Sequence, residues 1–305
     1  MSTLAYFVNQ LDQLDPTLHE PLYNVTYSRD IKLREDISIF NESSSFTRMT
    51  FGAVGTQSAT GKPWLNQNSN TLPNISIDGE RVVTPVRPLG QELVYSSIEL
   101  EKSVKLGQPI DVQKYNAMNI MHQMWTDEQV YIGDRALGSF GLINSPIVTL
   151  GPSTALNWET QSADAIIASV DELLEATYQQ SGYAVCPSKL LLPPRQFSIL
   201  CSKKVSVESG NYSLIEYLKR ATICLHINGI ELDIQPTKWL ANAGVGGLNR
   251  MVAYTNEPQR VRFPMVPIRR ETPYFQGINF CAPYTWAFGE VEIVYPDTIQ
   301  YRDGI

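Results

Sequence analysis

Two long segments carry apolar side chains at the 3.6-residue spacing of an amphipathic helix, and a capping sequence predicts a third helix. In the first, residues 110–132, one face consists of Tyr115, Met118, Met121 with His122, and Trp125. This pattern predicts the longest helix of the chain. Residues 163–178 have apolar side chains at the same spacing and follow Ser162, a suitable N-cap. Residues 214–220 follow Ser213, and Ser213 with Glu216 has the spacing of a capping box.

Alternating apolar and polar positions predict strands in the rest of the chain. Residues 46–92 hold two such runs around an amide-rich tip, which predicts a long two-stranded ribbon. Because an isolated ribbon is marginally stable in water, we expect it to dock on a partner subunit. Further strands are predicted at residues 186–192, 230–234 and 249–255, and the chain is β-rich from residue 261 to its end. Helices and strands in this order indicate a mixed α+β protein.

The first 45 residues look like an arm rather than a domain. Leu4 and Phe7 begin a short apolar pattern of helical spacing, which Asp15-Pro16 interrupts. Residues 20–27, including Tyr23, are predicted to be extended. Such a segment has little to pack on within itself, so we expect it to lie on its own subunit or on a neighbour.

The composition and charge of the chain argue against several classes of protein. The 305 residues are 43% hydrophobic and 18% charged, which is enough apolar material for about two folded domains. The net charge of −7 argues against nucleic-acid binding through the average field of the chain. No apolar run is long enough for a membrane span, and no secretory signal is recognised at the start. The four cysteines form no CxxC pair, which favours reduced thiols in a cytosolic protein.

No motif for catalysis, phosphate binding or metal binding is present. His122 is interpreted as a structural histidine, and Asp127-Glu128 as a solvated helix face. The glycine-rich residues 244–247 are interpreted as a flexible loop. The arginines at 260, 262, 269 and 270 form a local basic cluster, for which salt bridges within or between subunits are favoured over contact with packaged nucleic acid.

The order of arm, ribbon, long helix, mixed domain and β-rich end resembles the major capsid proteins of tailed bacteriophages, with the Hong Kong 97-like fold. Several segments carry the resemblance: residues 94–100, 107–111, 130–134, the Gly138–Pro146 loop, Leu191–Phe197 and the closing residues 295–305. The resemblance implies an N-terminal arm (1–45), an E-loop (46–92), a peripheral domain with the spine helix (93–147 and 263–305) and an axial domain (148–262).

The function implied by the resemblance is structural. The chain is expected to assemble as hexamers and pentamers into an icosahedral shell that encloses double-stranded DNA without sequence-specific binding. Decoration, scaffolding and portal proteins are its expected partners, and the host bacterial cytoplasm is the expected place of assembly into the virion. No catalytic residue, cofactor or metal is expected. The alternatives are an encapsulin-type nanocompartment shell, an unrecognised α+β enzyme, and a tail or baseplate component.

The residues expected at inter-subunit contacts come from the arm, the ribbon and the basic cluster. They are Leu4, Phe7, Tyr23, Phe51, Lys62, Trp64, Ile75, Ile77, Arg260, Arg262, Arg269 and Arg270. Some members of the fold form an isopeptide crosslink, for which Lys62 and Asn279 with Glu290 or Glu292 are the candidates here. No motif aligns these residues, so an ordinary exposed role is favoured for Lys62.

Overall fold

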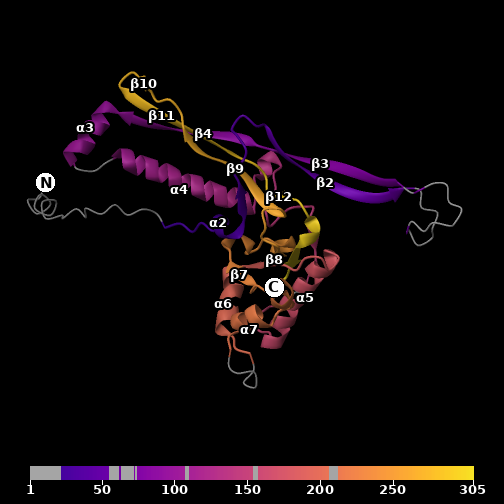
Figure 1. The fold of residues 1–305 in the computed structure, drawn as a ribbon. Helices are drawn as coiled ribbons and strands as arrows, with labels where there is room; N and C mark the ends of the chain where they lie inside the picture. The colour runs from indigo at the N-terminus through magenta and orange to yellow at the C-terminus, as the bar shows by residue number, and fades with distance from the viewer. Residues whose placement is uncertain are drawn as a thin grey trace, which may run out of the picture.

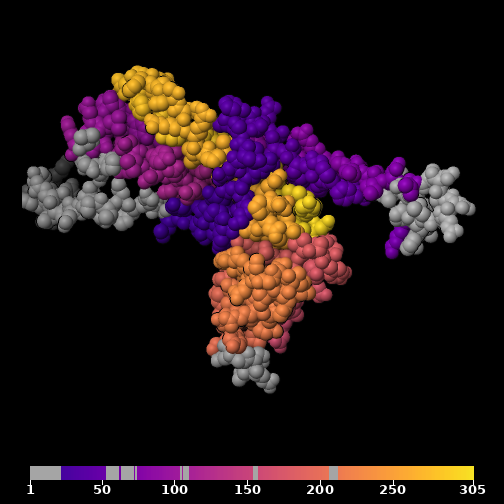
Figure 2. Space-filling view, in the orientation of Figure 1, coloured from indigo at the N-terminus to yellow at the C-terminus, as the bar shows by residue number. Residues whose placement is uncertain are grey.

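The chain forms three projecting parts instead of a sphere (Figure 1). The computed structural model describes residues 22–54, 62, 72, 74–106, 110–153, 157–205 and 212–305. One part holds the long helix and a sheet, a two-stranded ribbon extends in the opposite direction, and a third part hangs below their meeting point. In the space-filling view the ribbon is a narrow projection from the body (Figure 2). This outline offers edges to neighbours on several sides.

The upper part, called the peripheral part here, is built on a six-stranded sheet. β9 (Val261–Arg270) lies between the parallel strand β1 (Lys32–Arg34) and the antiparallel strand β11 (Asn279–Phe288). β4 (Arg87–Ser96) pairs with β11 along its whole length. The two short strands are β10 (Tyr274–Gln276), which pairs with β11, and β12 (Glu292–Ile293), which pairs with β9.

Two helices follow β4 in the sequence, α3 (Ser97–Leu106) and α4 (Ile110–Tyr131). The predicted long helix is therefore confirmed to within a residue. Its buried face, however, is Met118, His122, Thr126, Asp127, Val130 and Tyr131. Three residues that the sequence placed on this face, Tyr115, Met121 and Trp125, are 42%, 39% and 36% exposed. The i, i+4 row 118–122–126–130 forms the buried face, and these three residues lie off it.

The loop after α4 turns back onto the end of the helix. The Gly141 amide donates to the Asn144 side chain (2.7 Å), and that side chain donates to the Ile132 carbonyl (2.7 Å). A Cβ on Gly141 would lie 2.2 Å from the Tyr131 carbonyl oxygen, so only glycine fits there. The glycine and asparagine of this loop thus fix where the chain leaves the helix.

The ribbon consists of β2 (Ser43–Val54) and β3 (Asn74–Pro85), which pair antiparallel over twelve residues each. At about 3.4 Å per residue each strand reaches about 40 Å. The predicted ribbon is confirmed, and the strand that follows it, β4, belongs to the peripheral sheet.

The third part, called the axial part here, has a five-stranded sheet of order β5-β13-β8-β6-β7. Its strands are β5 (Thr149–Leu150), β6 (Lys189–Leu192), β7 (Asp233–Pro236), β8 (Arg250–Tyr254) and β13 (Ile299–Asp303). Its helices are α5 (Ala163–Gln180), α6 (Pro194–Ser202), α7 (Leu214–Ala221) and α8 (Ile223–Asn228). Short 3₁₀ turns occur at Arg135–Leu137, Lys238–Leu240, Val245–Gly247 and Pro296–Thr298.

The axial sheet is buried on both faces, and its alternate residues enter two different cores. Met251 and Ala253 of β8 face the core shared with α5–α8. Val252 and Tyr254 of the same strand belong to the core that continues into the peripheral sheet and the end of α4. A strand that is buried on both faces contributes side chains to the core on each side. β8 therefore joins the axial part to the peripheral part.

Several local predictions need correction. Ser162 caps α5 as expected, through the Ala165 amide (3.3 Å), whereas the Ser213 side chain makes no capping bond to α7. The strand predicted at 186–192 begins at Lys189, and the one predicted at 230–234 begins at Asp233. Both starts lie later because the preceding residues pack as connections to α5 and α8.

The glycine-rich loop is also more ordered than the sequence suggested. The Val245 amide donates to Asp303 (2.9 Å), and the Gly244 amide donates to the Leu248 carbonyl (2.7 Å). A Cβ on Gly244 would lie 2.7 Å from the Asp303 carboxyl carbon. The loop is therefore a turn held against β13, and Gly244 allows that close approach.

Candidate functional site

The ribbon has one apolar and one polar face. Directly paired residues of an antiparallel ribbon lie on the same face, and the pairs include Phe51 with Ile77 and Arg48 with Glu80. The apolar ribbon face consists of Met49, Phe51, Ile75, Ile77 and Val83, which are 64%, 74%, 78%, 65% and 53% exposed. Large apolar side chains gathered on one exposed face mark an interaction surface.

The opposite face is the one turned toward the subunit's own body. Near the ribbon root, Arg48 donates to the Ile293 carbonyl of β12 (3.1 Å), while Phe46 and Val82 are half-buried. Farther out this face carries Thr50 and Asp78. The apolar ribbon face therefore points away from the chain that bears it.

A buried carboxylate fixes the angle of the ribbon root. Glu292 of β12 is 1% exposed, and it accepts hydrogen bonds from Ser44 of β2 and from Arg262 of β9 (2.6 Å). Arg34 of β1 pairs with the same carboxylate at 3.3 Å, and Thr84 of β3 is 3.4 Å away. A buried charge with partners on four strands holds them in one arrangement, since losing any partner leaves charge uncompensated.

A second buried carboxylate, Asp127 of α4, ties residues 22–34 to the body. Its Oδ1 accepts from the backbone amides of Thr26 (2.8 Å) and Tyr27 (3.0 Å), the start of the short helix α2 (Tyr27–Asp30). Its Oδ2 accepts from the Trp239 indole at 2.7 Å. The carboxylate therefore caps α2 from a distant part of the chain. The sequence interpretation of Asp127 as solvated is wrong, because the residue lies on the buried face of α4 and is 1% exposed.

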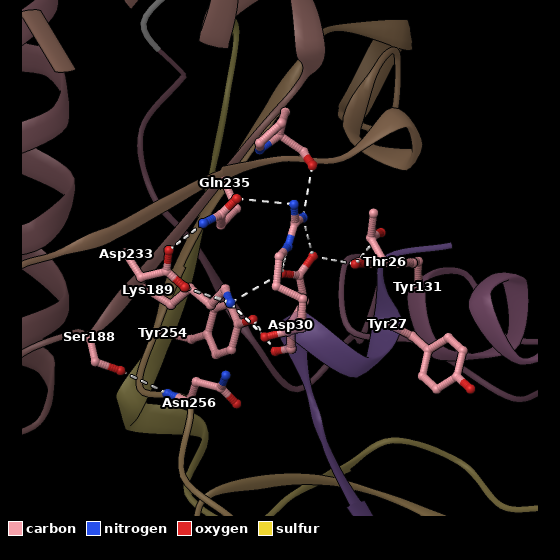
Figure 3. Close-up of polar contacts among 12 residues, drawn as sticks. Thr26, Tyr27, Asp30, Tyr131, Ser188, Lys189, Asp233, Gln235, Tyr254 and Asn256 are labelled. Carbon is pink, nitrogen blue, oxygen red and sulfur yellow. Dashed lines mark hydrogen bonds and ion pairs between the residues drawn. The ribbon is translucent and has the colours of Figure 1, made fainter. Parts of the chain in front are cut away.

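A third buried carboxylate, that of Asp30, also joins the arm to the body (Figure 3). It is fully buried and lies 3.1 Å from the Lys189 ammonium of β6, and Tyr131 of α4 donates to it. Arg29 also binds it through two nitrogens (2.7 and 2.8 Å). Burial, then the charge of Asp30, raises the pKa of the Tyr131 hydroxyl, which keeps this hydroxyl a donor.

We call the contacts of Asp30 and Asp127 the arm joint. It brings together α2, helix α4 and strand β6, so the arm, the peripheral part and the axial part meet there. The prediction of an extended segment over 20–27 is corrected at its end, where Tyr27–Asp30 form a helical turn. The arm side chains that make this joint, Arg29 and Asp30, attracted no attention in the sequence, because ion pairs across distant segments leave no local pattern.

An apolar patch that sequence reasoning missed lies at the far end of the peripheral sheet. The β10–β11 turn exposes Phe275 (77%) and Ile278 (64%), and Ile98 of α3 is 56% exposed. The Ser97 amide donates to the Ile278 carbonyl (3.2 Å), so these segments are adjacent. Apolar residues flanking Gly277, whose φ is +63°, were the available signal, since turns are usually polar.

The predicted contact residues have the following positions. Leu4, Phe7 and Trp64 lie outside the described residues. Tyr23 is 44% exposed and Lys62 is exposed, while Phe51, Ile75 and Ile77 share the apolar ribbon face.

The four arginines do not form one patch. Arg262 belongs to the ribbon root with Glu292, and Arg260 pairs with Glu257 at 2.7 Å. Arg269 is exposed near Glu271 (3.5 Å), and Arg270 lines a hollow with Tyr95 and Tyr115. Their interactions within the subunit agree with the favoured salt-bridge reading, and contacts between subunits stay a prediction.

The crosslink candidates are apart within one subunit. Asn279 begins β11, and Glu290 follows the end of that strand, about 30 Å away at strand spacing. Glu290 accepts from the Phe140 amide (2.8 Å), and Glu292 is held by two arginines. These carboxylates have structural partners within the subunit, and the role of Lys62 stays a prediction.

His122 has no features of a catalytic base. It is 6% exposed and lies edge-on to Trp286, with ring centroids 5.3 Å apart. Burial lowers its pKa to about 4, so the ring is neutral at pH 7. Among the described residues, no group of three or more His, Cys, Asp or Glu is arranged to hold a metal ion. No helix in this described part is long and apolar enough to cross a membrane.

The comparisons with known proteins agree with this geometry. The capsid protein of Myoviridae phage XM1 superimposes with a TM-score of 0.79 at 16% identity, over 97% of this chain and 98% of that one. The protein from Mycobacterium phage Ogopogo gives 0.60 at 12% identity, over 99% of both chains. The encapsulin of Synechococcus elongatus gives 0.54 at 12% identity, over 100% of this chain and 96% of that one. No curated protein matches the chain.

These likenesses establish the Hong Kong 97-like capsid fold that the sequence resemblance predicted. The family follows from a separate observation, a family model described as major capsid protein that matches residues 61–305. The role of such a chain is structural and not enzymatic, and it assembles with copies of itself into a shell. The chain belongs to the major capsid protein family.

Proposed function

We propose that this protein forms the icosahedral head shell of a tailed phage, as hexamers and pentamers that enclose double-stranded DNA. The observation that carries the proposal is the likeness to the capsid of Myoviridae phage XM1 over nearly the whole of both chains. Assembly would take place in the host bacterial cytoplasm, with scaffolding, portal and decoration proteins as partners. The division into arm, E-loop, peripheral and axial domains belongs to the same proposal.

The proposal assigns the ribbon a mechanical role. Its apolar face packs on a neighbouring copy, because nothing in the described part of its own chain covers Phe51, Ile75 or Ile77. Full burial of one such side chain contributes about 1.5–3 kcal/mol. Five of them repeated at every subunit contact give a cooperative shell, even after the entropy lost on association is subtracted. Heterologous contacts of this kind close into rings.

The charge of the chain suits a DNA container. At a net charge of −7, the subunit has no average attraction for phosphate, so packaged DNA is confined without being bound tightly. The arginines of the basic cluster are engaged mainly with acidic neighbours, as Arg262 with Glu292 shows. This arrangement supports enclosure rather than sequence-specific recognition.

The test is expression of the full chain, with and without the phage genes beside it, followed by light scattering and electron microscopy. Closed shells or ring-shaped capsomers are expected. Nucleic acid in particles purified after nuclease treatment supports the phage head. Shells that hold a protein cargo and no DNA overturn this proposal in favour of a nanocompartment, for which the encapsulin likeness is the precedent. A chain that stays monomeric under all these conditions overturns both.

A further inference from the structure

Two buried cysteines face each other in the axial part. The Sγ atoms of Cys186, just before β6, and Cys224, in α8, are 2.8 Å apart and share a hydrogen bond. They are 1% and 0% exposed and belong to the core between α5–α8 and the axial sheet. Both carry free thiols, as do Cys201 and Cys281. Of the four, only Cys186 and Cys224 are placed against each other.

The backbone around this pair is fixed on both sides. Asn228, at the end of α8, donates to the carbonyls of Cys186 (3.2 Å) and Pro187 (3.3 Å). Thr255, beyond β8, donates to the Cys186 carbonyl as well (3.4 Å). The two sulfurs are therefore held together by contacts that do not depend on them. Closing the gap from 2.8 Å to an S–S bond of about 2.05 Å is a short movement of the two sulfurs.

The hydrogen bond makes the two thiols chemically unequal. This bond lowers the pKa of Cys186 and raises the pKa of Cys224. The thiolate is the form that reacts with oxidants, so Cys186 is the sulfur that reacts first. The Cys224 sulfur lies 2.8 Å away and completes the reaction.

We propose that Cys186 and Cys224 form a disulfide after the shell leaves the reducing cytoplasm, so that the thermal stability of an assembled particle increases after release. The Cys186 thiolate attacks a peroxide, which gives a sulfenic acid and one water. The Cys224 sulfur then attacks that sulfenic sulfur, and a second water leaves. Two thiols lose two electrons and two protons in total, and hydrogen peroxide gains them. The change of compartment rests on the proposed function, whereas the reactivity of the pair does not.

The consequence is mechanical. The bond joins residues 38 positions apart, and so fastens α8 to the connection that enters β6. Crosslinks of this span stabilise mainly by restricting the unfolded chain. We expect the melting temperature of oxidised particles to rise by about 5 °C or more over reduced ones.

The experiment counts thiols in particles of the full chain, unfolded in denaturant with an alkylating agent. Particles isolated under reducing conditions are expected to show four free thiols per subunit, and particles treated with hydrogen peroxide two. Peptide mass spectrometry should then find the fragments containing Cys186 and Cys224 joined. The variant C224A should give no joined fragments after the same treatment, because Cys186 then has no second sulfur beside it. The control C281A, a buried cysteine of the other core, should lose two as the native chain does.

Four thiols after peroxide treatment, or linked fragments that contain Cys201 in place of the pair, would overturn the proposal. The same count on capsomers or monomers separates it from the proposed function. If the chain forms no shell but the pair still oxidises, the shell proposal fails and the disulfide stands. If shells form and the pair stays reduced, the reverse holds.

Discussion

The ribbon and the axial sheet are both β-structures, but they are stabilised in opposite ways. Every residue of the axial strands β6, β8 and β13 is buried, between four helices on one side and the shared core on the other. The ribbon's strands are longer, yet Phe51, Ile75 and Ile77 are more than 60% exposed. Hydrophobic burial within the chain therefore explains the first region and leaves the second without a core.

The difference separates contacts made within the subunit from contacts expected between subunits. In the proposed shell, a two-stranded ribbon with an uncovered apolar face gains its stabilising contacts when a second copy packs on it. Two of the buried carboxylates, Glu292 at the ribbon root and Asp127 at the arm joint, hold the ribbon and the arm in fixed directions relative to the body. We therefore propose that the ribbon is oriented by its own chain and stabilised by a neighbouring one.

The largest effect is expected from the apolar ribbon face. The double variant F51K/I77K puts two charges on one cross-strand pair, and charge on a buried contact is strongly unfavourable. We expect the yield of closed particles to fall at least about 10-fold, since about 1.4 kcal/mol per contact already changes an association constant by that factor. Sedimentation of expressed particles measures it.

The control for this variant is T50K/S76K, on the opposite ribbon face. It adds the same charge at neighbouring positions and should leave most of the particle yield intact. Equal losses from both double variants would mean that the apolar face is not the contact.

The second-largest effect is expected at the ribbon root, where loss of the Glu292 carboxylate should lower the free energy of unfolding. In E292A, Arg34 and Arg262 lose their shared partner, which costs about 3–4 kcal/mol of unfolding free energy. Urea unfolding of the unassembled subunit measures the loss. E257A removes a half-exposed pair with Arg260 and should cost under about 1 kcal/mol. A loss in E292A no larger than in E257A would remove Glu292 from the account of how the ribbon is aimed.

A substitution at the arm joint should lower the free energy of unfolding by less than E292A does. D127A takes away the acceptor of the Thr26 and Tyr27 amides and of the Trp239 indole, a cost of about 2–3 kcal/mol. Faster proteolysis between residues 22 and 34 is expected with it. The adjacent exposed Glu128 supplies the control E128A, for which neither change is expected. An intact arm in D127A would show that Asp30 alone holds the joint.

At neutral pH the smallest effect is that of His122, because it appears only on acidification. Its pKa is about 4 in the folded chain, below the ordinary 6.5 of the unfolded one, so the unfolded state binds the extra proton first. Stability should therefore fall as the pH drops from about 6.5 to about 4, by about 3 kcal/mol. H122L should lose that part of the slope, and H226Q, at an exposed position, should keep it. An unchanged slope in H122L would contradict the assignment.

Elements with a repeating pattern were predictable from sequence, and joints between distant segments were not. The helix over 110–132 and the ribbon over 46–92 followed from period and alternation, and the family resemblance supplied their arrangement. Asp127 was misread because one polar residue on a helix carries no sign of its distant partners. Ser213 was misread because a capping sequence permits a capping bond without requiring one. The exposed apolar turn was visible in the sequence as Phe275 and Ile278 on either side of Gly277.

The central claim, that the apolar ribbon face is covered by a neighbouring copy, is tested most directly by amide hydrogen exchange on unassembled subunits and on closed particles. Exchange in β2 and β3 should slow at least about 10-fold on assembly, while exchange in the buried axial strands β8 and β13 stays the same. Equal exchange of the ribbon in the two states would contradict the account, because its apolar face would then remain open to water in the shell.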